Sequence, residues 1–247
     1  MAAGTDVPVL AHYMPWFETP QSNLEAPGQW GYHWTLQNRN PNIILSNGQR
    51  DIASHFYPLI GPYASNDPDV IEYHLLLMKA AGIDGIIVDW YGVQGTNGDI
   101  GGLLRNSNAI ANKVYTYGLD FAVMLEDRFS SNIGDAVANV AYCRDNYFHL
   151  PSYARDDQTN EPWFFNFGPI TFENPSAWSQ ILSAAGEPVQ FLPLQYQSNE
   201  AGNNGDGEFY WPTENEALDN HLSLLNTFYN NRAPDLNRAV GAVYPSF

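Results

Sequence analysis

AGIDGIIVDWYG, residues 81–92, indicates the fold class more strongly than any other part of the chain. Its middle, Ile83 to Val88, is a short, largely apolar run rich in β-branched residues, and it ends in Asp89, Trp90 and Tyr91. A strand that is hydrophobic nearly throughout is buried on both faces, as in a parallel sheet covered by helices. In such sheets ligands bind at the carboxyl ends of the strands. An acid flanked by aromatic rings at that end indicates a site for a sugar ring.

Strands and helices alternate along the rest of the chain. Apolar runs predict strands at 7–13, 83–89, 121–125, 162–167, 189–194 and 239–244. Helical periodicity predicts helices at about 68–81, 103–117, 133–148, 176–185 and 213–229. Asn66 or Asp67 is expected to cap the first helix, and Thr213 with Glu216 forms a capping-box pattern at the last. This alternation predicts βαβ units and a parallel sheet.

The expected fold is therefore α/β, of the (β/α)8 TIM-barrel type, with residues 1–247 as one domain. A long irregular loop, 18–65, interrupts it after the first strand, and loops of this length are usually functional. Six convincing strand–helix steps are fewer than a closed barrel needs, so we expect a barrel that is truncated or incomplete at its C-terminal end. The alternative is an open sheet.

Composition narrows the functional class. The 247 residues contain 27 acids and 10 bases, a formal charge of −17, which argues against nucleic acid or an anionic membrane as partner. No apolar stretch approaches the roughly 20 residues that span a bilayer. The single cysteine, Cys143, excludes an internal disulfide and is expected to be a buried small residue. Low charge density and scarce cysteine favour a secreted or periplasmic protein, although no signal peptide is visible.

Carboxylates remain as the main chemical groups, because no P-loop, dinucleotide fingerprint, zinc helix or nucleophile elbow is present. We expect no cofactor. Asp89 and Glu126 each end a predicted strand, and parallel strands lie about 4.8 Å apart. Glycoside hydrolysis uses two carboxyl groups roughly 5 Å apart for retention or 6.5–9.5 Å apart for inversion. Asp89 and Glu126 are therefore the catalytic candidates, and the alternative is that each caps a helix or pairs with Arg128. Asp127 and Asp84 are expected to be structural.

Aromatic residues at the predicted strand ends are the second signal. Flat rings receive the apolar faces of sugars, while tyrosine and histidine bond the hydroxyl groups. The candidate substrate-binding residues are His12, Tyr13, Trp16, Trp90, Tyr91, Arg128, Glu208, Tyr210 and Trp211. Any one ring could instead belong to the core. His33 and Trp34 form a lid, a subsite wall or plain loop structure, and His74 is expected to be structural.

Residues 203–208, NNGDGE, supply oxygen ligands on a loop, as a calcium site does. The segment lacks the spacing of an EF-hand, so we expect no metal site.

Several of these segments together resemble a known family. HYMPWF at 12–17, DPDVIEYH at 67–74 and AGIDGIIVDWYG at 81–92 are similar to glycoside hydrolase family 71/99-like proteins. GEFYWP at 207–212 and VYPSF at 243–247 are similar in kind. The resemblance implies a (β/α)8-barrel enzyme, in a group that includes endo-α-mannosidases and α-1,3-glucanases.

The resemblance also affects the expected roles. The family continues into an Asn-Glu/Asp-Trp/Tyr-x-Glu-Gly-Thr segment that holds its principal catalytic carboxylates, and this chain ends before such a motif. By resemblance, Asp89, Glu126 and the aromatic residues would then bind substrate or support catalysis. We expect a glycoside hydrolase that acts inside a glycan on α-linkages. The alternatives are a non-catalytic carbohydrate-binding or degenerate barrel, and an interaction module with a protein partner.

Overall fold

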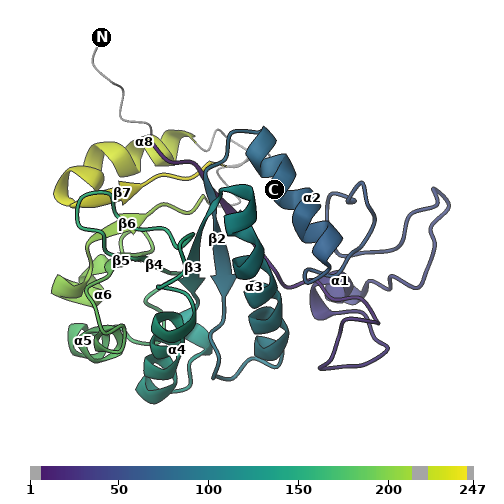
Figure 1. The fold of residues 1–247 in the computed structure, drawn as a ribbon, viewed down its shortest axis with the longest axis horizontal. Helices are drawn as coiled ribbons and strands as arrows, with labels where there is room; N and C mark the ends of the chain where they lie inside the picture. The colour runs from purple at the N-terminus through teal and green to yellow at the C-terminus, as the bar shows by residue number, and fades with distance from the viewer. Residues whose placement is uncertain (1–6, 213–221, 244–247) are drawn as a thin grey trace, which may run out of the picture. The chain divides into compact units, whose positions relative to one another are not determined.

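The computed structural model describes residues 7–212 and 222–243, and the chain forms two compact units. Unit 1 is Met1–Asp89 with Gly98–Ala122, and unit 2 is Trp90–Asn97 with Val123–Phe247. Figure 1 shows the order of the elements by colour. The prediction that residues 1–247 form one domain stays a prediction.

Strands β1 (Leu10–Tyr13) and β2 (Gly85–Trp90) pair in parallel in unit 1, with Leu10 opposite Gly85. Every residue of β2 is buried, which confirms the expectation from its apolar sequence. The predicted first strand was too long, because Val9 precedes the paired residues. Its amide donates to the Asp84 carboxylate at 2.8 Å, so Asp84 is structural as expected.

Two helices of unit 1 lie close to their predicted positions. Helix α2 (Pro68–Ala80) has Asp67 as its cap, whose carboxylate accepts the Asp69 amide at 2.9 Å. Helix α3 (Ile100–Val114) begins three residues before the predicted start and continues into a 3-10 turn, Tyr115–Tyr117. Figure 1 shows the two helices, which are in contact. The Lys79 ammonium group at the end of α2 donates to the Gly118 carbonyl at 2.8 Å.

The long loop is irregular but has its own aromatic core. It contains helix α1 (Tyr32–Thr35) and a 3-10 turn, Leu36–Asn38. Trp34 is buried, its ring lies 4.1 Å from that of Phe17, and its indole nitrogen donates to the Tyr63 carbonyl at 3.0 Å. Trp34 therefore holds the loop together rather than forming a lid.

Strand β3 (Asp120–Leu125) begins in unit 1 and ends in unit 2. In unit 2 it pairs in parallel with β4 (Trp163–Asn166), which pairs in parallel with β5 (Gln190–Pro193). Strand β6 (Gly207–Phe209) pairs in parallel with β7 (Arg238–Val240). The expected parallel arrangement is confirmed for each of these pairs.

The described residues of unit 2 also form helices α4 (Ile133–Asn146), α5 (Pro175–Ser183), α6 (Ser198–Ala201) and α8 (Leu222–Asn231). Asn132 and Asn174 cap α4 and α5, and α6 was not expected from the Gly/Asn-rich sequence. Cys143 is fully buried in α4, as predicted. The predicted capping box at Thr213 and the end of the strand predicted at 239–244 lie outside the described residues.

Among the residues that the structure describes, no helix is both long and apolar enough to cross a lipid bilayer.

Candidate functional site

A cavity of about 290 Å³ lies in unit 1, where the first turn of α3 meets the beginning of the long loop. Its lining combines carboxylic acids, amides and aromatic rings. The residues are Trp16, Glu18, Asn23, Glu25, Ala26, Gln29, Trp30, Gly31, Tyr32, Thr35, Asp99, Gly102, Leu103 and Asn106. The volume suits a small ligand, and the lining offers it both polar groups and flat apolar rings.

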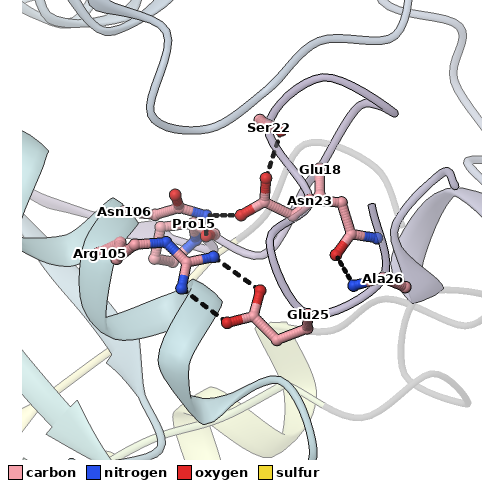
Figure 2. Close-up of polar contacts among 8 residues, drawn as sticks. All are labelled: Pro15, Glu18, Ser22, Asn23, Glu25, Ala26, Arg105 and Asn106. Carbon is pink, nitrogen blue, oxygen red and sulfur yellow. Dashed lines mark hydrogen bonds and ion pairs between the residues drawn. The ribbon is translucent and has the colours of Figure 1, made fainter. Parts of the chain in front are cut away.

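Glu18 is a buried acid in this wall (Figure 2). The Asn106 side-chain amide donates to Glu18 Oε1 at 2.9 Å and to the Pro15 carbonyl at 2.7 Å. The Ser22 hydroxyl donates to the other carboxyl oxygen of Glu18. Burial raises the pKa of Glu18, and the hydrogen bonds from Ser22 and Asn106 oppose this only in part. Glu18 therefore holds a proton to higher pH than an exposed glutamate does.

Glu25 has a pKa that is shifted in the opposite direction to that of Glu18. Both terminal nitrogens of Arg105 donate to its two carboxyl oxygens, each at 2.6 Å (Figure 2). Such bidentate charge-assisted pairs are stronger than neutral hydrogen bonds. The hydrogen bonds from Arg105 lower the pKa of Glu25, although partial burial opposes them, so this carboxylate stays ionised.

Two glycines in the first turn of α3 allow these acids to approach the helix. A Cβ at Gly101 would lie 2.7 Å from Glu25 Oε1. A Cβ at Gly102 would lie 3.4 Å from both Glu18 Oε1 and Glu25 Oε2, so these two oxygens are within twice that distance of each other. The N-terminal end of a helix carries partial positive charge and favours carboxylates at this place.

Aromatic rings form another part of the wall. The ring of Trp16 is stacked on that of His33, with centroids 4.2 Å apart and planes inclined by 3°. His33 Nε2 lies 3.6 Å from a carboxyl oxygen of Asp99. Trp30 and Tyr32 are partly exposed in the same lining. These rings offer flat apolar faces next to acids and amides, which is the combination that a sugar requires.

The pKa values of the two glutamates are displaced in opposite directions, which is the arrangement expected of an acid and a base in one site. Among the described residues, no group of three or more His, Cys, Asp or Glu side chains is placed to hold a metal ion. In the segment 203–208, the Asp206 carboxylate accepts the Phe191 amide at 2.9 Å.

Of the predicted site residues in unit 1, Trp16 lines the cavity, and His12, Tyr13 and Asp89 do not. The Tyr13 hydroxyl bonds to His74 Nδ1 at 2.9 Å, and Tyr13 is buried, so His74 is structural as predicted. Burial lowers the pKa of His12 to about 4. Asp89 is 1% exposed at the end of β2.

In unit 2, Glu126 is half-buried and its amide donates to the Trp90 carbonyl at 3.0 Å. Trp90 is fully buried against the rings of Tyr142 and Tyr147. Tyr91 is buried too, and Arg128 is exposed. Trp90 and Tyr91 therefore belong to the core in this structure and not to an exposed rim.

The predicted structural role of Asp127 is confirmed. Its buried carboxylate accepts the amides of Ile170, Thr171 and Phe172 at 2.8–3.2 Å. It thereby fixes the backbone that follows β4.

Of the last three predicted residues, Glu208 lies in β6, and Tyr210 and Trp211 directly follow it. Glu208 is fully buried and forms an ion pair with Arg232 at 2.6 Å, so its carboxylate is committed to protein groups. Tyr210 is buried against Phe228, with ring centroids 5.6 Å apart. Trp211 is half-buried and its amide donates to Gln195 Oε1 at 2.7 Å. Glu208 and Tyr210 therefore contribute to packing, and the substrate-binding roles of all nine candidates stay predictions.

Sequence reasoning missed Glu18, Glu25, Trp30, Asp99 and Asn106 because they follow no strand. Asn106 is 88 residues from Glu18, and Arg105 is 80 residues from Glu25. The one available signal was the concentration of acids and aromatic residues in the long loop.

A parallel α/β fold with acids and flat rings around one cavity is typical of glycoside hydrolases. A model of glycosyl hydrolase family 99 matches residues 5–194, and the chain belongs to this family.

The relatives support this assignment. The glycoprotein endo-alpha-1,2-mannosidase of Xenopus laevis is 27% identical over 184 residues, which cover 70% of this chain and 40% of that protein. The Rattus norvegicus protein of the same name is 28% identical over 192 residues, covering 72% and 40%. The chain thus spans about two fifths of the length of the curated relatives it matches.

Solved structures agree on the fold. The GH99 endo-alpha-mannosidase from Bacteroides thetaiotaomicron matches with a TM-score of 0.70 at 20% identity, over 96% of this chain and 71% of that one. A glycoside hydrolase-like protein matches with a TM-score of 0.53 at 12% identity, over 76% and 66%. The fold is of the (β/α)8-barrel type, and the described residues form part of such a barrel, as predicted.

Proposed function

We propose that this protein is a glycoside hydrolase that cleaves α-linked mannose-containing or related glucan-like glycans at internal linkages. The observation that carries the proposal is membership of family 99 over residues 5–194. The relatives named endo-alpha-1,2-mannosidase support α-mannose as the sugar. The unit 1 cavity supports it independently, because flat rings and acids lie together there.

The roles of the acids follow from their chemistry. Asp89 and Glu126 are the proposed catalytic residues. Glu18, with its raised pKa, is able to donate a hydrogen bond or a proton to a sugar oxygen, and Glu25 accepts from a hydroxyl. If two carboxyl groups act, the pH dependence of the rate is bell-shaped.

The experiment is incubation of the 247-residue chain with α-mannans, α-glucans and algal polysaccharides, followed by analysis of the released oligosaccharides. We expect internal cleavage of an α-mannan, and a loss of at least about a hundredfold in rate in Glu126→Gln, the typical contribution of a general acid or base. The control is Glu173→Gln, which changes an exposed acid of the same unit. Unchanged activity in Glu126→Gln would remove this residue from catalysis, and no cleavage of any glycan would refute the proposal.

Carbohydrate binding without hydrolysis is the second candidate. One observation favours it: the oxygens of Glu25 are both held by Arg105, and those of Glu18 by Ser22 and Asn106. Carboxyl groups engaged in this way are suited to shaping a site. Glycan binding with no released product would support this candidate.

We also propose that the protein is secreted or periplasmic, on the basis of its low charge density and single cysteine. Fractionation of the native host, with detection of the protein in each compartment, tests this.

A further inference from the structure

The charge of the cavity wall is one-sided. Glu18, Glu25 and Asp99 contribute three carboxyl groups to a lining that lies wholly within the described residues and contains no lysine, arginine or histidine. The neighbouring cation, Arg105, is already engaged, because both of its terminal nitrogens donate to Glu25. A ligand in this cavity therefore meets carboxyl groups and no cationic side chain of the lining itself.

The Glu25 carboxylate also occupies the position beside Arg105 where an anionic ligand would otherwise bind. Without it, the Arg105 guanidinium would lie at the first turn of α3 with no bidentate partner. Gly101 and Gly102 carry no side chain in this turn, and Glu25 Oε1 lies 2.7 Å from the place of a Cβ at Gly101. A guanidinium beside a helix N-terminus attracts phosphate or carboxylate. Glu25 fills that position from within the protein.

We propose that the cavity accepts a neutral pyranose residue and rejects sugars that bear phosphate, sulfate or carboxylate, and that Glu25 sets this selectivity by occupying Arg105. The inference rests on the proposed function, since it takes the ligand to be a glycan. It goes further because it names the chemical class that the site excludes and the residue responsible.

Specificity of this kind needs both attraction and repulsion. Trp16, Trp30 and Tyr32 supply faces for the ring of any hexose, charged or neutral. The discrimination therefore comes from the acids. A phosphate on the sugar would approach Glu25 and Asp99 in a partly buried wall, where solvent screens charge less than it does at an open surface.

The experiment is isothermal titration of the 247-residue chain with α-1,2-mannobiose and with its 6-phosphate, at low ionic strength. We expect the phosphate to bind at least tenfold more weakly. The difference should shrink as sodium chloride is added, because salt screens the repulsion. This salt series uses the unaltered protein, so it tests the inference whether or not a variant folds.

The variant is Glu25→Gln, which removes the charge and leaves Arg105 with a neutral partner. We expect the ratio of the two affinities to move at least tenfold toward the phosphorylated sugar. The matched control is Asp51→Asn, which makes the same charge change in the Arg39–Asp51 ion pair of the same loop, away from the cavity lining. The control should leave the ratio as it is.

Each outcome separates the inference from the function beneath it. Equal affinity for the two sugars overturns the inference and leaves the proposed function standing. An unchanged ratio in Glu25→Gln, or an equal shift in Asp51→Asn, overturns the role of Glu25. Failure to bind either sugar overturns the proposed carbohydrate function itself.

Discussion

Replacing Glu208 by glutamine should destabilise the protein, because the fully buried carboxylate binds four donors. Arg232 donates from Nε at 2.9 Å and from Nη2 at 2.6 Å, and the amides of Tyr196 and Ser198 donate at 2.9 and 3.2 Å. Glutamine has nearly the same shape, so the change removes the charge while leaving the volume of the side chain. It leaves Arg232 beside a neutral amide.

The size of the effect follows from burial. Breaking a buried ion pair by removing one partner costs about 3–5 kcal/mol. The Arg232 side chain is 19% exposed, so water can partly solvate its charge once the Glu208 carboxylate is removed. The lower limit of the range, about 3 kcal/mol, therefore applies. For a chain of this length that corresponds to a melting temperature lower by roughly 6–12 °C.

The pH dependence gives a second measure of the same interaction. Burial alone would raise the pKa of Glu208, but the hydrogen bonds from Arg232, Ser198 and the two amides hold it below the ordinary value. The stabilisation is therefore fully present above the ordinary glutamate pKa and is lost as pH falls through the lowered one. The difference between the wild type and Glu208→Gln should shrink over that acidic range.

Thermal and urea unfolding followed by circular dichroism provide the assay. Glu187→Gln serves as the control, because it breaks the more exposed Arg155–Glu187 pair and should cost less than about 1 kcal/mol. A Glu208→Gln protein as stable as the wild type, with lost glycan binding, would refute this reasoning and restore Glu208 as a substrate-binding residue.

Three further outcomes are expected. Trp16→Ala should weaken glycan binding by about tenfold in titration calorimetry, since it removes a wall of the cavity, whereas Tyr115→Ala, exposed and outside the lining, should change nothing. Burial lowers the pKa of His12 from 6.5 in the unfolded chain to about 4 in the folded protein, so the free energy of unfolding should fall as pH drops from 6.5 to 4. Urea unfolding measures this loss, which His12→Gln should remove and the control His55→Gln, at an exposed histidine, should not. Cys143 is fully buried and its thiol pKa is raised well above the usual value, so Ellman's reagent should react with it only after unfolding; rapid labelling of the native protein would contradict this burial.

The sequence was informative where local pattern and burial coincide. Most of the apolar run predicted at 83–89 lies in β2, Gly85–Trp90, every residue of which is buried, and Asp67 with Pro68 marked the start of α2. These features depend on hydrophobic periodicity and on backbone donors a few residues away, and both can be read along the chain. The burial of aromatic residues at strand ends was not visible in the sequence. Trp90 and Tyr210 are aromatic residues of the kind that stack on sugars, and both are buried in the structure.

Order of elements, parallel pairing and family membership thus followed from the linear chain, because apolar spacing and short motifs carry them. The cavity did not, because it forms from residues that are far apart in sequence and become neighbours on folding. Glu18 and Glu25 are ordinary loop acids until Asn106 and Arg105 on α3 meet them across 88 and 80 residues. Their opposite pKa displacements come from burial and from a guanidinium, and both are properties of the folded environment.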